Sequence, residues 1–168
     1  MSSKGRRSPG RAVLAAAILL TAEAVQAASP SLKLSGFDSG ALDRARAGAV
    51  RRLQNDECRK VFTDFKDAQG RTLQQNLAEW AETPADYVAL VPFLDGTRET
   101  LCRKSNIALV SSPGVRRVYV CKTFADLQLK QPGVAESMVI HEILHTLGLG
   151  ENPPSSQEIN ARILKRCH

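Results

Sequence analysis

The segment from His141 to Glu151 reads HEILHTLGLGE, and its residue types and spacing are suited to metal chemistry. On an α-helix, residues four apart lie on the same face, so His141 and His145 can direct two imidazole nitrogens at one ion. Glu142 is turned by about 100° from His141 on such a helix. Its carboxylate therefore lies beside the ion, where it can accept a proton from a bound water. Gly148 permits a turn with positive φ, after which Glu151 can fold back as a third ligand.

This ligand set favours zinc in a catalytic role. Two imidazoles and one carboxylate leave a fourth zinc position for water, whereas structural zinc sites are usually closed by four protein ligands. Zinc lowers the pKa of its water toward neutrality, and Glu142 would be the general base that accepts the proton. The chain has three histidines, and two of them lie in this motif.

The motif resembles the long zinc-binding consensus of the metzincin metallopeptidases, which reads HExxHxxGxx followed by His or Asp. The small secreted bacterial snapalysins have Asp where this chain has Glu151, and the wider segment is similar to one in small exported zincin-like proteins. The resemblance implies a zincin-like fold and a zinc metallopeptidase with His141, His145 and Glu151 as ligands and Glu142 as general base. Metzincins place a methionine turn after the motif, but both methionines of this chain precede Glu151, so the broader zincin class is the better description.

The third ligand has an alternative. Thermolysin-like zincins take theirs from a glutamate on a later helix, and Glu158 lies in the first turn of a helix expected after the motif. Glu158 is also suited to a capping arrangement with the serines before it. His168 is a third candidate, at the end of the chain beside Cys167. Glu151 remains the first choice because its offset matches the motif.

These observations predict a secreted zinc-dependent endopeptidase that acts on a peptide or protein substrate. The alternative is an exported or envelope-associated zincin-like domain that binds zinc without proteolysis, since only a short segment follows Glu151. A third possibility is a metal-free domain in which the motif is accidental. Tyr87, Arg116 and Tyr119 are candidates for stabilising the oxyanion, and no pattern selects one of them.

The N-terminal residues have the features of a cleavable export signal. A basic leader precedes an apolar run from Ala12 to Leu20, and small residues at Val25-Gln26-Ala27 suit a signal peptidase that cuts after Ala27 or Ala28. The run is shorter than the ~20 residues that span a bilayer, and Glu23 interrupts its end, so we expect no stable membrane anchor. A secreted or periplasmic location follows.

Residues 28–168 are expected to form a single domain. Removing residues 1–27 takes away four of 23 basic and one of 17 acidic residues, which leaves 19 minus 16, or +3. Because this charge is small and no aromatic residues alternate with a basic patch, we expect no nucleic-acid partner.

All four cysteines follow the export signal, and an even number in an exported chain predicts two disulfides. We favour Cys102–Cys121, because those residues flank an expected strand pair, and Cys58–Cys167, which would join an early helix to the last one. The alternatives are Cys121 as a thiolate ligand and Cys58 as a latency cysteine that occupies the metal.

The hydrophobic pattern predicts an α+β fold, with a small, mostly antiparallel sheet in front of the motif helix. Helices are expected at Ser39–Leu53, from Asn55 or Asp56 to Phe65, at Thr72–Ala81, at Val134–Leu147 and from Ser155 or Ser156 to Lys165; strands are expected at Tyr87–Leu94, Ile107–Val110 and Val115–Phe124. The last of these strands comes just before the motif helix. It is therefore the candidate for a free sheet edge that holds an extended substrate, the alternative being an ordinary core strand.

Overall fold

A computed structural model describes residues 39–168 of the chain. The expected export signal, residues 1–27, lies outside the described residues. The helices are α1 (Ser39–Leu53), α2 (Asp56–Arg59), α3 (Val61–Asp64), α4 (Leu73–Leu77), α5 (Pro84–Leu90), α6 (Thr100–Lys104), α7 (Phe124–Lys130), α8 (Pro132–Thr146) and α9 (Ser156–Arg166), and the strands are β1 (Phe93–Asp95), β2 (Leu109–Ser112) and β3 (Val115–Val120). The fold class is α+β, as predicted.

The three strands form one mixed sheet with the order β1-β3-β2. Strand β3 pairs with β1 in parallel and with β2 antiparallel, so the sheet is not mostly antiparallel. The prediction that the segment Val115–Phe124 supplies a free edge is wrong, because β3 is the central strand. The edge strand nearest the motif helix is β2, and β3 itself ends at Val120, before Phe124 begins α7.

The predicted strand Tyr87–Leu94 is mostly helix. The Thr83 side chain accepts a hydrogen bond from the Asp86 N–H, and Pro84 stands in the first turn, where its lack of an N–H costs nothing. These signals start α5, which buries Tyr87 and Val88. Only Phe93–Asp95 remains as strand β1, because an apolar run of this length fits either structure and the helix cap before it decides.

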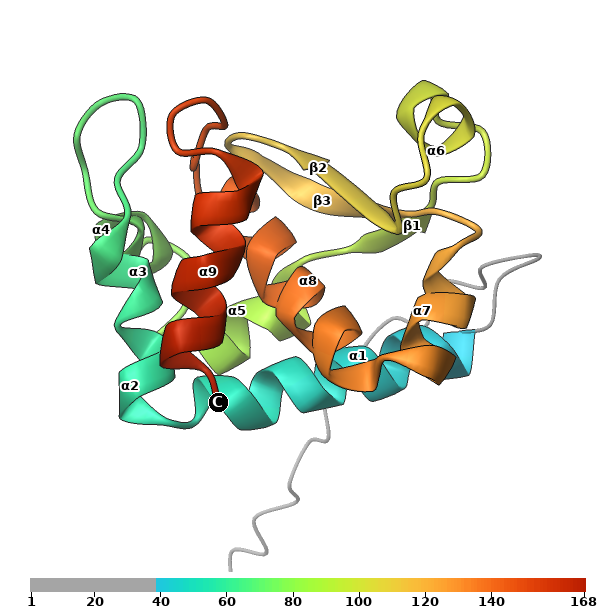
Figure 1. The fold of residues 1–168 in the computed structure, drawn as a ribbon. Coiled ribbons are helices and arrows are strands. Elements are labelled where there is room, and N and C mark those ends of the chain that lie inside the picture. The colour runs from blue at the N-terminus through green and yellow to red at the C-terminus, as the bar shows by residue number, and fades with distance from the viewer. Residues whose placement is uncertain (1–38) are drawn as a thin grey trace, which may run out of the picture.

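The motif helix α8 lies at the centre of the molecule, beneath the sheet and between α9 and α1 (Figure 1). Two of its faces are covered by helices, and β2 and β3 cover a third. The Glu136 side chain of α8 occupies the space left by Gly48 on α1, where a Cβ would lie 2.2 Å from Glu136 Oε1. Arg52 on α1 donates to the same Glu136 carboxylate at 2.7 Å. The central helix is thereby fixed on several sides.

Both favoured disulfides are confirmed. Cys58–Cys167 joins α2 to the end of α9, and Cys102–Cys121 joins α6 to the end of β3. The ligand role for Cys121 and the latency role for Cys58 are therefore wrong. Two disulfides indicate an oxidising compartment. Among residues 39–168, no helix has both the length and the apolar character needed to cross a bilayer.

We expect the two disulfides to contribute unequally to stability, because a bridge that closes a longer loop restricts the unfolded chain more. The cysteines of Cys58–Cys167 are 109 residues apart and those of Cys102–Cys121 are 19 apart. Replacing the first pair by alanine should lower the free energy of unfolding by about 4 to 5 kcal/mol, and the second pair by about 3 kcal/mol. Guanidinium unfolding of the two variants measures both values; the reverse order would contradict the assignment.

Candidate metal centre

His141 and His145 lie one turn apart on α8 and face each other. Their Nε2 atoms are 3.0 Å apart, and each side chain is almost completely buried. Two imidazoles that share one tetrahedral zinc ion at 2.0–2.1 Å have nitrogens about 3.3 Å apart. The spacing therefore suits two ligands of a single ion.

The outer nitrogens of both rings have acceptors that determine their protonation. His141 Nδ1 lies 2.8 Å from the amide oxygen of Asn160 on α9, and His145 Nδ1 lies 2.7 Å from the carbonyl oxygen of Leu149. Because both partners accept, each Nδ1 donates, which leaves the two Nε2 atoms facing each other. Burial holds the pKa of His141 below its ordinary value, against the attraction of the Glu142 carboxylate. Two Nε2 atoms at this distance can share a proton or a cation.

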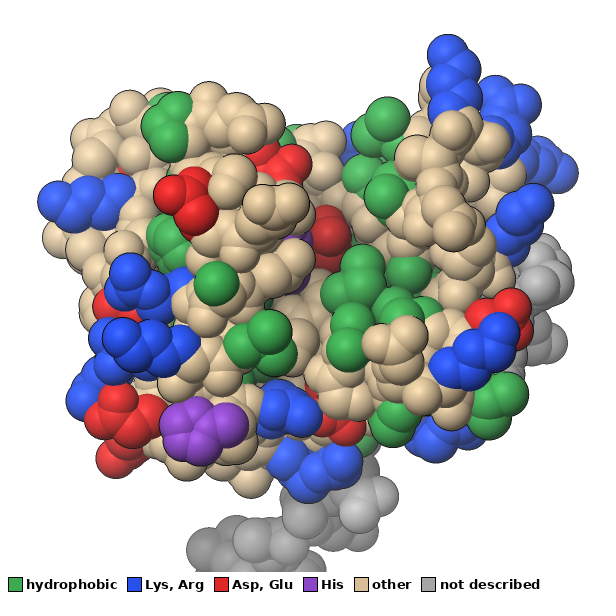
Figure 2. Space-filling view, viewed as in Figure 1, with side chains coloured by type: hydrophobic (Ala, Val, Ile, Leu, Met, Phe, Trp, Pro, Cys, Tyr) green, Lys and Arg blue, Asp and Glu red, His purple; other side chains and the backbone are tan. Residues whose placement is uncertain are grey.

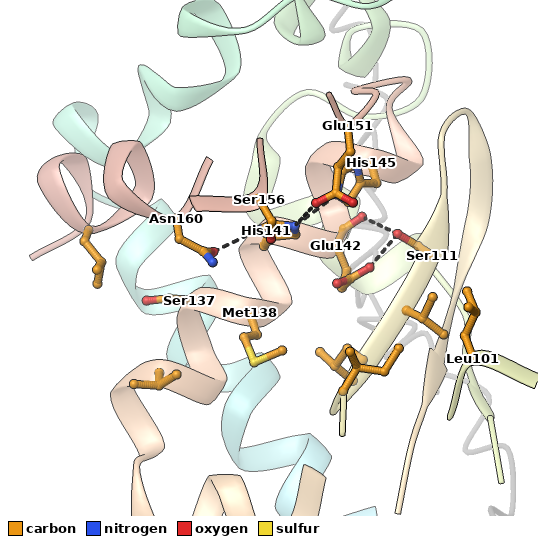
Figure 3. A pocket seen from close by; sticks show the side chains of 15 residues that line it. Leu101, Ser111, Ser137, Met138, His141, Glu142, His145, Glu151, Ser156 and Asn160 are labelled. Atoms are coloured by element: carbon orange, nitrogen blue, oxygen red, sulfur yellow. Dashed lines mark hydrogen bonds and ion pairs between the residues drawn. The ribbon is translucent and has the colours of Figure 1, made fainter. Parts of the chain in front are cut away.

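Glu151 completes a group of three donors. Its Oε1 lies 3.9 Å from both Nε2 atoms, and the three candidate ligand atoms all lie within 4.8 Å of one another (Figure 3). Gly148 turns the chain after α8 with φ 105°, as the motif predicts, and a Cβ there would come within 3.2 Å of Asp67 Cβ. Two nitrogens and one carboxylate oxygen suit a divalent ion such as zinc. These three residues could hold a metal ion.

The other two candidates for the third ligand are placed elsewhere. Glu158 belongs to a capping box: its Oε2 accepts from the Ser155 N–H at 2.7 Å, and the Ser155 hydroxyl accepts from the Glu158 N–H. The Glu158 carboxylate thus serves the start of α9. His168 is exposed and pairs through Nδ1 with the Lys165 carbonyl. Neither belongs to the three-donor group.

Glu142 lies beside this group and is turned toward the sheet (Figure 3). Its side chain is 6% exposed, and its Oε2 accepts a hydrogen bond of 2.7 Å from the Ser111 hydroxyl on β2. Ser111 and Asn160 were not singled out from the sequence. They lie 31 and 19 residues from their partners, and no local pattern marks either one.

A cavity of about 430 Å³ opens in front of the site. Its apolar walls come from four elements and the segment before β2: Leu101, Ile107, Leu109, Val110, Val134, Met138 and Leu164. Figure 2 shows this face as a hollow with apolar side chains gathered at its border. Among residues 39–168, the acidic side chains that line the cavity are those of Glu142 and Glu151, and no lysine or arginine lines it.

The outer edge of β2 borders the same cavity. The Val118 N–H donates to the Pro92 carbonyl, so the peptide groups at the even positions of β3 face β1. Tyr119 faces β2 and pairs with Val110. By the alternation of an antiparallel ladder, the N–H and C=O of Leu109 point away from β3. No further strand pairs with this edge among residues 39–168.

None of the three candidates for the oxyanion role lines this cavity. Tyr87 is fully buried, with its hydroxyl 3.3 Å from the Thr146 hydroxyl, and burial raises its pKa. Arg116 stacks on Trp80 instead, and Tyr119 contacts Arg117.

The three-donor group gives opposite expectations for the two glutamates. Glu151→Ala removes a donor that faces both Nε2 atoms, so we expect a loss of zinc affinity of tenfold or more. Glu158→Ala removes only a helix cap and should leave zinc affinity unchanged while lowering stability by about 1 kcal/mol. Competition titration with a chelator measures the affinities, and thermal unfolding measures the stability. If Glu158→Ala lost zinc and Glu151→Ala did not, Glu158 would be the third ligand instead of Glu151.

The interpretation of this site depends on the residues themselves. Comparison of the chain with known protein families, with curated proteins and with solved structures finds no match in any of the three. What the described residues offer is a buried pair of imidazoles, a carboxylate that faces both, and a second carboxylate that accepts a hydrogen bond from a serine.

Proposed function

We propose that this protein is a zinc-dependent endopeptidase with a zincin-like site. The observation that supports this most directly is that the two glutamates of the site have different positions and different partners. Glu151 faces both imidazole nitrogens, whereas Glu142 is held away from them by Ser111. A structural site would use its carboxylates as ligands. Here the Glu142 carboxylate, which is next to the candidate ligands, bonds to Ser111 instead. That is the arrangement of a general base beside an ion.

The residues that would hold zinc are His141, His145 and Glu151. When bound, zinc would polarise a water molecule and the substrate carbonyl, and would lower the pKa of that water toward neutrality. Glu142 would take the proton of the attacking water and pass it to the leaving amine. Ser111 orients the Glu142 carboxylate by donating to Oε2. Glu142 lines the cavity, so its carboxylate would be next to a substrate bound there.

Peptide binding is supported by the cavity in front of the site. An extended substrate segment would lie beside β2, which lines this cavity and is an edge strand of the sheet, as in other cases where a peptide adds a strand to a sheet edge. A side chain of that segment would then enter the apolar cavity, where burial of apolar surface contributes about 25 cal/mol per Å².

Export is part of the same proposal. The two disulfides require an oxidising compartment to persist, and the basic and apolar leader is suited to directing the chain there. A secreted or periplasmic peptidase would meet peptide or protein substrates in that compartment.

The role of Glu142 is tested by Glu142→Gln, which preserves size but removes the base. We expect zinc to be retained in equal amount, because Glu142 is not a ligand, and cleavage of casein or a peptide library to fall by about 10²- to 10⁴-fold. Metal content and cleavage are measured on the same preparations. If wild-type protein binds zinc but shows no Glu142-dependent cleavage of any substrate, the non-proteolytic zinc-binding alternative holds instead.

The role of Ser111 is tested by comparing alanine with threonine. Ser111→Ala removes a hydrogen bond to a charged group, worth about 1.5 to 3 kcal/mol, so we expect kcat to fall by about tenfold or more. KM should change little, since the hydroxyl faces Glu142. Ser111→Thr keeps the hydroxyl and should restore most of the rate. Equal losses in both variants, or a change confined to KM, would assign Ser111 a merely structural role.

A further inference from the structure

A second cavity, of about 310 Å³, lies at the C-terminal end of the motif helix. It is lined by Thr146, Leu147 and Gly148, which directly follow the candidate ligand His145, and by Gly114 at the tip of the β2–β3 hairpin. The Gly114 N–H donates to the His145 carbonyl at 2.9 Å. The two cavities thus meet the same turn of α8, and the hairpin tip that ends β2 reaches the second one.

An aromatic residue and a cation form one wall of this second cavity. The guanidinium carbon of Arg116 lies 3.5 Å from the ring centroid of Trp80, and the Trp80 side chain is 49% exposed. Stacking on the ring face fixes the plane of the guanidinium group but does not use its N–H groups. The donors at the edge of the plane stay available for a planar, bidentate acceptor.

The charges around the cavity leave Arg116 without a counter-ion. Arg71 forms an ion pair with Glu79. Asp67 accepts from Asn76 Nδ2 at 2.8 Å and from the N–H groups of Gln69 and Arg71 at 2.9 Å, and the Asn76 bond in particular holds its pKa below the ordinary value. In the part of the chain described by the structure, the Arg116 guanidinium forms no ion pair and no hydrogen bond, although the Asp67 and Glu79 carboxylates line the same cavity. The formal charges of the lining residues sum to zero, and Arg116 is the charged lining residue whose N–H groups have no partner.

We propose that the Trp80–Arg116 pair is a second peptide-binding site, which binds an acidic side chain of a peptide that extends past the hairpin tip from the metal centre. The statement that this peptide is a substrate rests on the proposed function. The statement that a carboxylate binds at this pair is independent of it. A single free cation matches the single charge of a carboxylate, and the guanidinium fork matches its geometry. The two cavities border consecutive residues of α8, since His145 lines the first and Thr146 lines the second.

The chain offers a direct reporter, since Trp80 is its single tryptophan. The Glu142→Gln protein, loaded with zinc, would be titrated with eight-residue peptides of alanine and leucine that contain one glutamate, placed at each position in turn, and with their glutamine counterparts. We expect at least one glutamate peptide to change Trp80 fluorescence saturably, with a dissociation constant about tenfold or more below that of its glutamine counterpart. Arg116→Gln should abolish that difference.

Arg117→Gln is the matched control, because it removes the same charge from the next residue of β3, whose side chain points to the opposite face. It should leave the preference for glutamate intact. Equal binding of all glutamate and glutamine peptides, or a preference that persists in Arg116→Gln, would overturn the proposal. An equal fluorescence change with sodium acetate at the same carboxylate concentration would reduce the site to an adventitious ion only, and would also overturn it.

This experiment separates the two proposals, because fluorescence does not depend on cleavage. Carboxylate binding without any peptidase activity of the wild-type protein would contradict the proposed function and leave the second site standing. Cleavage that does not depend on glutamate, without any fluorescence response, would support the proposed function and contradict the second site.

Discussion

Two imidazoles are held with their Nε2 atoms facing each other at 3.0 Å, and much of the molecule serves to keep them there. In a buried place, where charge and dipole interactions are strong, this pair of nitrogens suits a shared cation. Nothing in the local helix forces this arrangement, since either ring is free to turn about its χ angles. The Nδ1 hydrogen bonds to Asn160 and Leu149 impose it. A cation bound between the rings would be coordinated by both nitrogens, and hydrogen-bond partners of the outer ring nitrogens typically change metal affinity by about 10- to 100-fold.

The surrounding fold can be understood as support for those two hydrogen bonds. Asn160 belongs to α9, which is tied to α2 by the Cys58–Cys167 disulfide and to α3 by the ion pair of Arg166 with Asp64. The Leu149 carbonyl is fixed because its side chain is fully buried and its N–H bonds back to Leu144. On the opposite side, the hairpin tip binds the His145 carbonyl and Ser111 holds Glu142. Each contact comes from a different element, so the site depends on the complete domain.

The parts of this structure that the sequence predicts best are those set by local spacing. The offsets among His141, His145, Gly148 and Glu151 are short, and the structure brings the three donors together after a turn with positive φ at Gly148. The disulfide pairing was predictable because each bridge flanks recognisable elements. The strand at Tyr87–Leu94 was predicted wrongly, because composition alone does not separate a short apolar strand from a capped helix. The edge position of β2, and with it Ser111, depended on strand order, which no local pattern encodes.

The central claim is that the facing nitrogens and Glu151 bind one metal ion. X-ray absorption at the zinc edge, on protein that has bound one equivalent of zinc, tests this directly. We expect a first shell of nitrogen and oxygen at 2.0–2.1 Å, the outer-shell scattering of two imidazoles, and no sulfur at about 2.3 Å. An oxygen-only shell without imidazole scattering, or no zinc retained at one equivalent, would contradict the account.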